Sequence, residues 1–112
     1  MGAVDAGEDA ATAARRELAE EIGFRAAALV QVGQYRAAPG LTGQTVTVFV
    51  CPMSEQVLDS VAASPPRSDE IQRVRIVTRS EVNAMVAGSG ITDGFSLAGL
   101  LLLGIWLERQ TA

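Results

Sequence analysis

Three glutamates, Glu17, Glu20 and Glu21, stand together near the start of the chain, in the segment RRELAEEIG. On an α-helix these positions are i, i+3 and i+4, so the three carboxylates share one face although like charges repel. Two interpretations are open at this point. The cluster is a solvated acidic stripe, as most such runs are, or its oxygens bind a divalent cation.

The composition limits the chemistry that the chain can perform. Its 112 residues include nine arginines but no lysine or histidine, and Cys51 is the only cysteine. A Ser-His-Asp triad, a Schiff-base lysine, an intrachain disulfide and a multi-cysteine zinc site are therefore excluded. Acid–base or metal chemistry has to use carboxylates, whose oxygens favour hard cations such as magnesium or manganese.

Charge and hydropathy also limit the classes of partner. The net charge is -4 and no basic patch stands out, which gives no reason to expect nucleic-acid binding. Residues 1–14 are acidic and alanine-rich, without the apolar run of a signal peptide. The apolar run at 96–107 is shorter than the roughly 20 residues that span a bilayer, and it predicts a buried helix instead. We expect a cytoplasmic protein that binds neither nucleic acid nor membrane.

Periodicity and turn residues predict the elements that must position the glutamates. We expect helices at 9–23, at 80–86 with Ser80 as its cap, and at 95–108, the last one buried on nearly every side. We expect strands at 28–35, 45–51 and 71–77, a loop at 36–43 and a mobile surface loop at 54–70, which contains Pro65 and Pro66. This order predicts a single domain, 1–112, of the α+β class, an α/β/α sandwich with a mixed sheet between helices.

The glutamates belong to a longer pattern. Gly2 is followed after five residues by Glu8, and after seven more by the segment from Arg16 to Phe24. This resembles the Nudix box, G-x5-E-x7-R-E-U-x-E-E-x-G-U, with every fixed position filled. The resemblance implies that Glu17, Glu20 and Glu21 bind Mg²⁺ or Mn²⁺. It also implies that Glu8 supports the site, that Arg16 orients the glutamates through salt bridges, and that the loop at Gly2 supplies a backbone carbonyl.

Further segments resemble the ADP-ribose pyrophosphatase branch of the family. They are MGAVDAGE before the helix, the Pro-Gly pair sixteen residues beyond Gly23, and the tail SGITDGFSLAGLLLL. The branch implies a substrate-binding loop containing Pro39, Gly40 and Gln44, although an ordinary turn also explains the Pro-Gly pair. Gln44 stands where the branch commonly has a glutamate. The branch places its general base on a later loop, which here implies Glu70 or Asp69; a solvated charge pair is the alternative.

The resemblance implies a metal-dependent hydrolase of nucleoside diphosphate-linked substrates, and ADP-ribose cleaved to AMP and ribose 5-phosphate is the expected reaction. The chain begins inside the box, whereas family members carry strands before it that complete the sheet and often build a dimer. An uncovered sheet edge is a liability. We therefore expect a homodimer or completion by a partner chain, and the alternative is a non-catalytic or truncated Nudix-like nucleotide-binding or interaction module.

Overall fold

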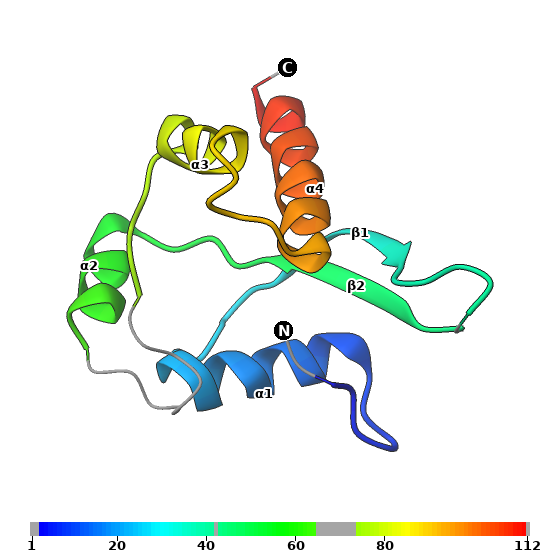
Figure 1. Cartoon of the computed structure of the whole chain (residues 1–112). Coiled ribbons are helices and arrows are strands. Elements are labelled where there is room, and N and C mark those ends of the chain that lie inside the picture. The colour runs from blue at the N-terminus through cyan, green and yellow to red at the C-terminus, as the bar shows by residue number, and fades with distance from the viewer. Residues whose placement is uncertain (1–2, 42, 65–73, 112) are drawn as a thin grey trace. The chain divides into compact units, whose positions relative to one another are not determined.

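The structure, a computed structural model, describes residues 3–41, 43–64 and 74–111. In these residues the chain forms helices and two strands, which confirms the predicted α+β class. Their order is α1 (Ala10–Ile22), β1 (Val30–Arg36), β2 (Thr45–Val50), α2 (Glu55–Ala63), α3 (Arg79–Ala87) and α4 (Gly94–Gln110) (Figure 1).

The described residues group into two compact units. One unit takes Met1–Val30 with Cys51–Ile76 and contains α1 and α2; the other takes Gln31–Val50 with Val77–Ala112 and contains the strands, α3 and α4. That all of 1–112 forms one domain stays a prediction. Among the helices of the described residues, none combines the length and the apolar character that spanning a bilayer requires.

Helix α1 has the ends that the sequence predicts. The Asp9 side chain caps its start by accepting a hydrogen bond from the Thr12 N–H at 2.7 Å. Gly23 ends it at φ 70°, a left-handed conformation that glycine adopts without the steric cost of a Cβ, and its N–H donates to the Ala19 carbonyl. One face of α1 packs closely enough to leave Ala13 only 4% exposed.

Helix α2 corrects the prediction of a loop at 54–70. Ser54 caps the helix by accepting from the Val57 N–H at 3.2 Å, and Glu55 lies in the first turn, where the helix dipole favours an acid. The half-buried residues Val57, Leu58 and Val61 follow helical spacing. The two prolines that suggested a loop lie beyond the end of the helix, so they are compatible with it.

Strands β1 and β2 form an antiparallel hairpin, and α4 packs on it. Ala37 and Gln44 close the hairpin through the Ala37 N–H and the Gln44 carbonyl at 3.3 Å. Helix α4 contacts β2, and in Figure 1 it stands upright over the strand and does not run along it. It also approaches β1 so closely that a Cβ on Gly33 would meet a Leu102 methyl at 2.8 Å.

The predicted strand at 71–77 is wrong in its described part, because residues 74–78 adopt no regular secondary structure. Ile76, one of the alternating apolar residues of this segment, is 48% exposed. Alternating apolar residues form a strand only where a neighbouring strand accepts their backbone hydrogen bonds, and within the described residues the sheet contains β1 and β2 alone.

The last two helices differ from the predictions in detail. Helix α3 begins at a Thr78 cap rather than at Ser80, because the Glu81 N–H donates to the Thr78 hydroxyl, which itself donates to the Glu81 carboxylate. Helix α4 forms as predicted but contains no buried residue, and Leu101 is 64% exposed. The predicted burial of α4 is wrong because an apolar helix becomes buried only where other elements cover each of its faces, and the β-hairpin covers one.

Candidate metal and pyrophosphate site

A tight turn precedes α1 and brings the Glu8 side chain back over its own loop. The Glu8 N–H donates to the Asp5 carbonyl at 3.1 Å, while the Asp5 N–H donates to Glu8 Oε1 at 3.0 Å. The Glu8 side chain is only 13% exposed as a result. The loop and the first turn of α1 therefore form one hydrogen-bonded unit, with the Glu8 carboxylate at its centre.

Arg16 joins this loop to the glutamates of the helix. Its Nε and Nη2 donate to the two oxygens of Glu8 at 3.1 and 3.2 Å, which is a bidentate pair. Nη2 also donates to the Ala3 carbonyl at 2.8 Å. Nη1 donates to Glu17 Oε1 at 3.0 Å and to Glu20 Oε2 at 3.4 Å. The guanidinium thus gathers carboxylates that would otherwise repel each other.

The ionisation of these groups reflects the same contacts. Hydrogen bonds from the Arg16 side chain, and then from the Asp5 backbone, lower the pKa of Glu8 below its usual value. Pairing with Glu8 raises the pKa of Arg16, assisted by the nearby charge of Asp5. Each group therefore stabilises the charged form of the other.

Two groups that bond to Arg16 were assigned no function from the sequence. They are Asp5, whose Oδ2 lies 3.5 Å from Arg16 Nη2, and the backbone carbonyl of Ala3. Asp5 is the aspartate of the MGAVDAGE segment, so its position in that motif was the available signal. No sequence signal marks a backbone carbonyl, because every residue has one.

The three glutamates expected to bind metal are not gathered at one point. Glu17 and Glu20 turn toward Arg16, whereas Glu21 makes no ion pair with any described residue. In the part of the chain that the structure describes, no three acidic, cysteine or histidine side chains converge closely enough to hold a metal ion. The donor set itself fits such an ion, because these are hard carboxylate oxygens on consecutive turns of one helix.

Pro39 and Gly40 lie in the loop of the β-hairpin. The Leu41 N–H donates to the Ala38 carbonyl at 3.1 Å, and Gly40 has φ 84°. A Pro-Gly pair with a positive φ at glycine is the signature of a type II turn. The interpretation as an ordinary turn therefore explains their local sequence, and their contact with a substrate stays a prediction, as does that of Gln44.

The remaining predicted site residues, Glu70, Asp69 and Gly2, lie outside the described residues.

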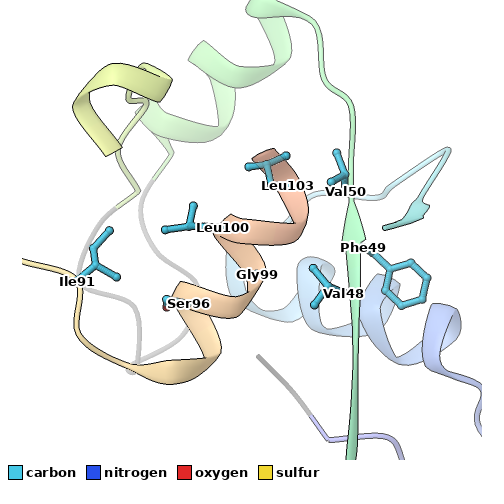
Figure 2. A pocket seen from close by; sticks show the side chains of 8 residues that line it. All are labelled: Val48, Phe49, Val50, Ile91, Ser96, Gly99, Leu100 and Leu103. Carbon is cyan, nitrogen blue, oxygen red and sulfur yellow. The ribbon is translucent and has the colours of Figure 1, made fainter. Parts of the chain in front are cut away.

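Each unit contains a cavity. In the unit with the hairpin, a cavity of about 380 Å³ opens between β2 and α4, and no charged side chain lines it. Figure 2 shows Val48 and Val50 on the α4 side of the strand and Phe49 on the opposite side, as strand alternation requires. Its lining comprises Val48, Phe49, Val50, Ile91, Ser96, Gly99, Leu100 and Leu103. Without a cation or an amide-rich loop in its lining, this cavity does not suit a pyrophosphate.

A second cavity, of about 370 Å³, lies between the end of α1 and α2. Its lining combines the aromatic ring of Phe24 with the amide of Gln56 and the hydroxyl of Ser60. The full set is Ile22, Gly23, Phe24, Gln56, Val57, Ser60, Val61 and Ser64. A loop at 54–70, as predicted from the sequence, would not form this cavity, because four of its residues need the helical spacing of α2.

Comparison with known families agrees with the motif. The family model of the NUDIX domain matches residues 1–92, and the chain therefore belongs to the NUDIX family. No curated protein matches the chain. The family in general comprises hydrolases of nucleoside diphosphate-linked small molecules, and its enzymes generally use divalent metals such as Mg²⁺.

Proposed function

We propose that the chain hydrolyses the pyrophosphate of ADP-ribose to give AMP and ribose 5-phosphate, in a reaction that requires Mg²⁺ or Mn²⁺. The observation that best supports this proposal is the complete set of box carboxylates, with Glu17, Glu20 and Glu21 on one capped helix and Arg16 bonded to Glu8, Glu17 and Glu20. The resemblance of MGAVDAGE and of the Pro39-Gly40 loop to ADP-ribose pyrophosphatases supports the choice of substrate.

Glu17, Glu20 and Glu21 would hold the metal through carboxylate oxygens. A divalent cation held there neutralises charge on the pyrophosphate and makes the attacking water more acidic. Glu8 and Arg16 would keep the loop and the helix together, because their bidentate pair spans the junction between them. Arg16 would also limit the repulsion among the glutamates.

The general base would be Glu70, or Asp69 beside it. The oxygen of a water molecule bonds to one phosphorus of the pyrophosphate, and the bond from that phosphorus to the bridging oxygen breaks. The base accepts the proton of the water, and the bridging oxygen leaves with the second phosphate. Pro39, Gly40 and Gln44 would contact the rest of the substrate, with the Gln44 amide offering hydrogen bonds without a charge.

Release of AMP from ADP-ribose by the purified chain, with and without Mg²⁺, tests this proposal. We expect metal-dependent turnover, and a fall of about 100-fold or more in kcat/KM for Glu21→Gln because the neutral amide weakens metal binding. Glu55→Gln is the matched control, since Glu55 is an exposed glutamate on α2, outside the box. This control variant should keep full activity.

Turnover that survives Glu21→Gln would contradict the assigned site. If Mg²⁺ raises the melting temperature but no substrate is cleaved, the chain is instead the non-catalytic nucleotide-binding module. A panel of other nucleoside diphosphate-linked compounds shows whether the proposed substrate or the proposed reaction is wrong. A pyrophosphohydrolase with another substrate would cleave at least one of them, whereas a chain without this activity would cleave none.

We also propose that the chain works as a homodimer, or with a partner chain that completes it. The exposed apolar residues of α4 support association, since exposed apolar surface favours burial against another protein. The cytoplasmic location stays a prediction.

A further inference from the structure

Arg16 uses its whole hydrogen-bonding capacity inside the candidate site. A guanidinium carries five N–H donors, and here all five have an acceptor. The donors divide into two sets by atom. Nε and Nη2 bind Glu8 and the Ala3 carbonyl, whereas Nη1 alone binds Glu17 and Glu20.

The two sets differ in how well they are held. The Glu8 carboxylate is 13% exposed and accepts two parallel hydrogen bonds, and the Ala3 carbonyl accepts at 2.8 Å. On the Nη1 side, Glu20 is 59% exposed and its contact is the longest of the five, at 3.4 Å. Pairs exposed to solvent contribute little free energy, so the Nη1–Glu20 contact is the easiest of the five to break. The Nη1–Glu17 contact is shorter, at 3.0 Å, and Glu17 is 22% exposed, but it is a single hydrogen bond without the bidentate geometry that holds Glu8.

We propose that Arg16 acts as an exchangeable internal cation: its Nη1 neutralises Glu17 and Glu20 until a divalent cation displaces it, while Nε and Nη2 keep Arg16 anchored to Glu8 and Ala3. The inference rests on the proposed function, which makes these glutamates metal ligands. It explains why no three carboxylates converge among the described residues, since Glu17 and Glu20 are turned toward the guanidinium.

Exchange has a consequence for affinity that a purely orienting arginine would not have. If the Nη1 pairs must break before metal binds, the free energy of breaking them is subtracted from the free energy of metal binding. Removing Arg16 should then tighten metal binding. An arginine that only holds the glutamates ready for the metal would have the opposite effect, because its loss would disorder the ligands.

Calorimetric titration of the full chain with Mg²⁺ alone, without nucleotide, measures this. We expect Arg16→Gln to bind Mg²⁺ about two- to fivefold more tightly than the unmodified chain, the range expected for loss of ion pairs at a protein surface. Arg15→Gln is the matched control: it removes the same charge one residue away, and Arg15 makes no ion pair with the described residues. The control should change the affinity less than Arg16→Gln does.

Affinity in Arg16→Gln that equals or falls below that of Arg15→Gln would overturn the exchange while leaving the proposed metal site intact. Failure of the unmodified chain to bind Mg²⁺ would overturn the proposed function and the exchange together. If the unmodified chain does not cleave ADP-ribose, but Mg²⁺ binds it and binds Arg16→Gln more tightly as expected, only the proposed reaction is overturned.

Nitrogen-15 NMR of the arginine side chains tests the exchange without any substitution, and therefore also if Arg16→Gln does not fold. With saturating Mg²⁺ we expect the Nη1 hydrogens of Arg16 to lose their protection, while the Nε–H resonance stays where the Glu8 pair places it. Unchanged Nη1 signals at saturation would show that metal binds with all five donors still engaged, and would overturn the proposal.

Discussion

Side-chain oxygens at helix N-termini are the best-defined single-residue interactions outside the candidate site. Asp93 caps α4 by accepting from the Ser96 N–H at 2.9 Å, as Asp9 does for α1. Hydrogen bonds from Ser96 hold the pKa of Asp93 below its usual value, and hydrogen bonds from Thr12 do the same for Asp9. Burial, and to a smaller extent the negative charge of Asp93, raises the pKa of Tyr35 on β1.

These caps predict how stability depends on pH. Because the folded pKa of Asp93 lies below the unfolded value of 3.8, its contribution is fully present above pH 3.8 and is lost as the pH falls through the folded pKa. Asp93→Asn keeps a capping oxygen but cannot titrate, so the acid-induced loss of unfolding free energy should be smaller. Urea unfolding on both sides of this pH measures the difference.

Asp59→Asn, at an exposed position inside α2, is the control for that experiment, and its unfolding should keep the acid dependence of the unmodified chain. A pH profile that is identical in Asp93→Asn and in the unmodified chain would contradict the assignment of this dependence to the cap.

Among the elements, α2 is the one whose start depends most clearly on a single local interaction. Its start depends on Ser54, whose hydroxyl accepts from the Val57 N–H. We expect Ser54→Ala to lower the free energy of unfolding by about 1 kcal/mol, because the N-terminal N–H groups lose their acceptor. Thermal or urea unfolding followed by circular dichroism measures the change.

Ser54→Asp replaces the hydroxyl with a carboxylate oxygen, which can also accept from the N-terminal N–H groups, so this variant should keep the stability that Ser54→Ala loses. If Ser54→Ala and Ser54→Asp unfold alike, the cap does not stabilise α2. Limited proteolysis gives an independent measure, since a frayed α2 should be cut faster after Ser54→Ala than in the unmodified chain.

For the molecule as an assembly, the exposed apolar residues of α4 are the main feature. Phe95, Leu101 and Ile105 are 38%, 64% and 45% exposed, and Leu101 and Ile105 are one turn apart. Two copies of α4 packed antiparallel about a two-fold axis would pair Leu101 of each helix with Ile105 of the other and bring Arg109 of each helix to the Asp93 end of the other. We therefore expect a second copy of the chain to fit this surface in both apolar character and charge.

We expect concentration-dependent dimerisation of the unmodified chain, and a shift toward monomer in Leu101→Gln because the buried apolar contact is lost. Analytical ultracentrifugation measures the equilibrium. Leu41→Gln, which removes an even more exposed leucine from the hairpin loop, is the control and should leave the equilibrium unchanged. A chain that stays monomeric at every concentration, or a Leu101→Gln variant that dimerises normally, would contradict this interface.

The features that were predicted correctly from the sequence depend on interactions within a few residues. The spacing of Glu17, Glu20 and Glu21, the Asp9 cap, the left-handed Gly23 and the alternation of β2 all depend on neighbours along the chain. Such short-range interactions form whatever the rest of the protein packs against the segment. The bounds of α1 and β2 and the α+β class could therefore be predicted. Helix α2 was missed because Pro65 and Pro66 were taken to mark a loop over all of 54–70, and the local signal of the Ser54 cap was not used.

Tertiary structure decided the features that need a partner distant in sequence. Arg16 reaches the Ala3 carbonyl thirteen residues away, and this contact depends on the turn at Asp5–Glu8. Residues 74–77 alternate like a strand yet form none in the structure, and α4 is apolar on all sides yet not buried. A backbone forms a strand only beside a hydrogen-bonding neighbour, and a side chain is buried only under another surface; periodicity reveals the capacity for both but not the presence of the partner.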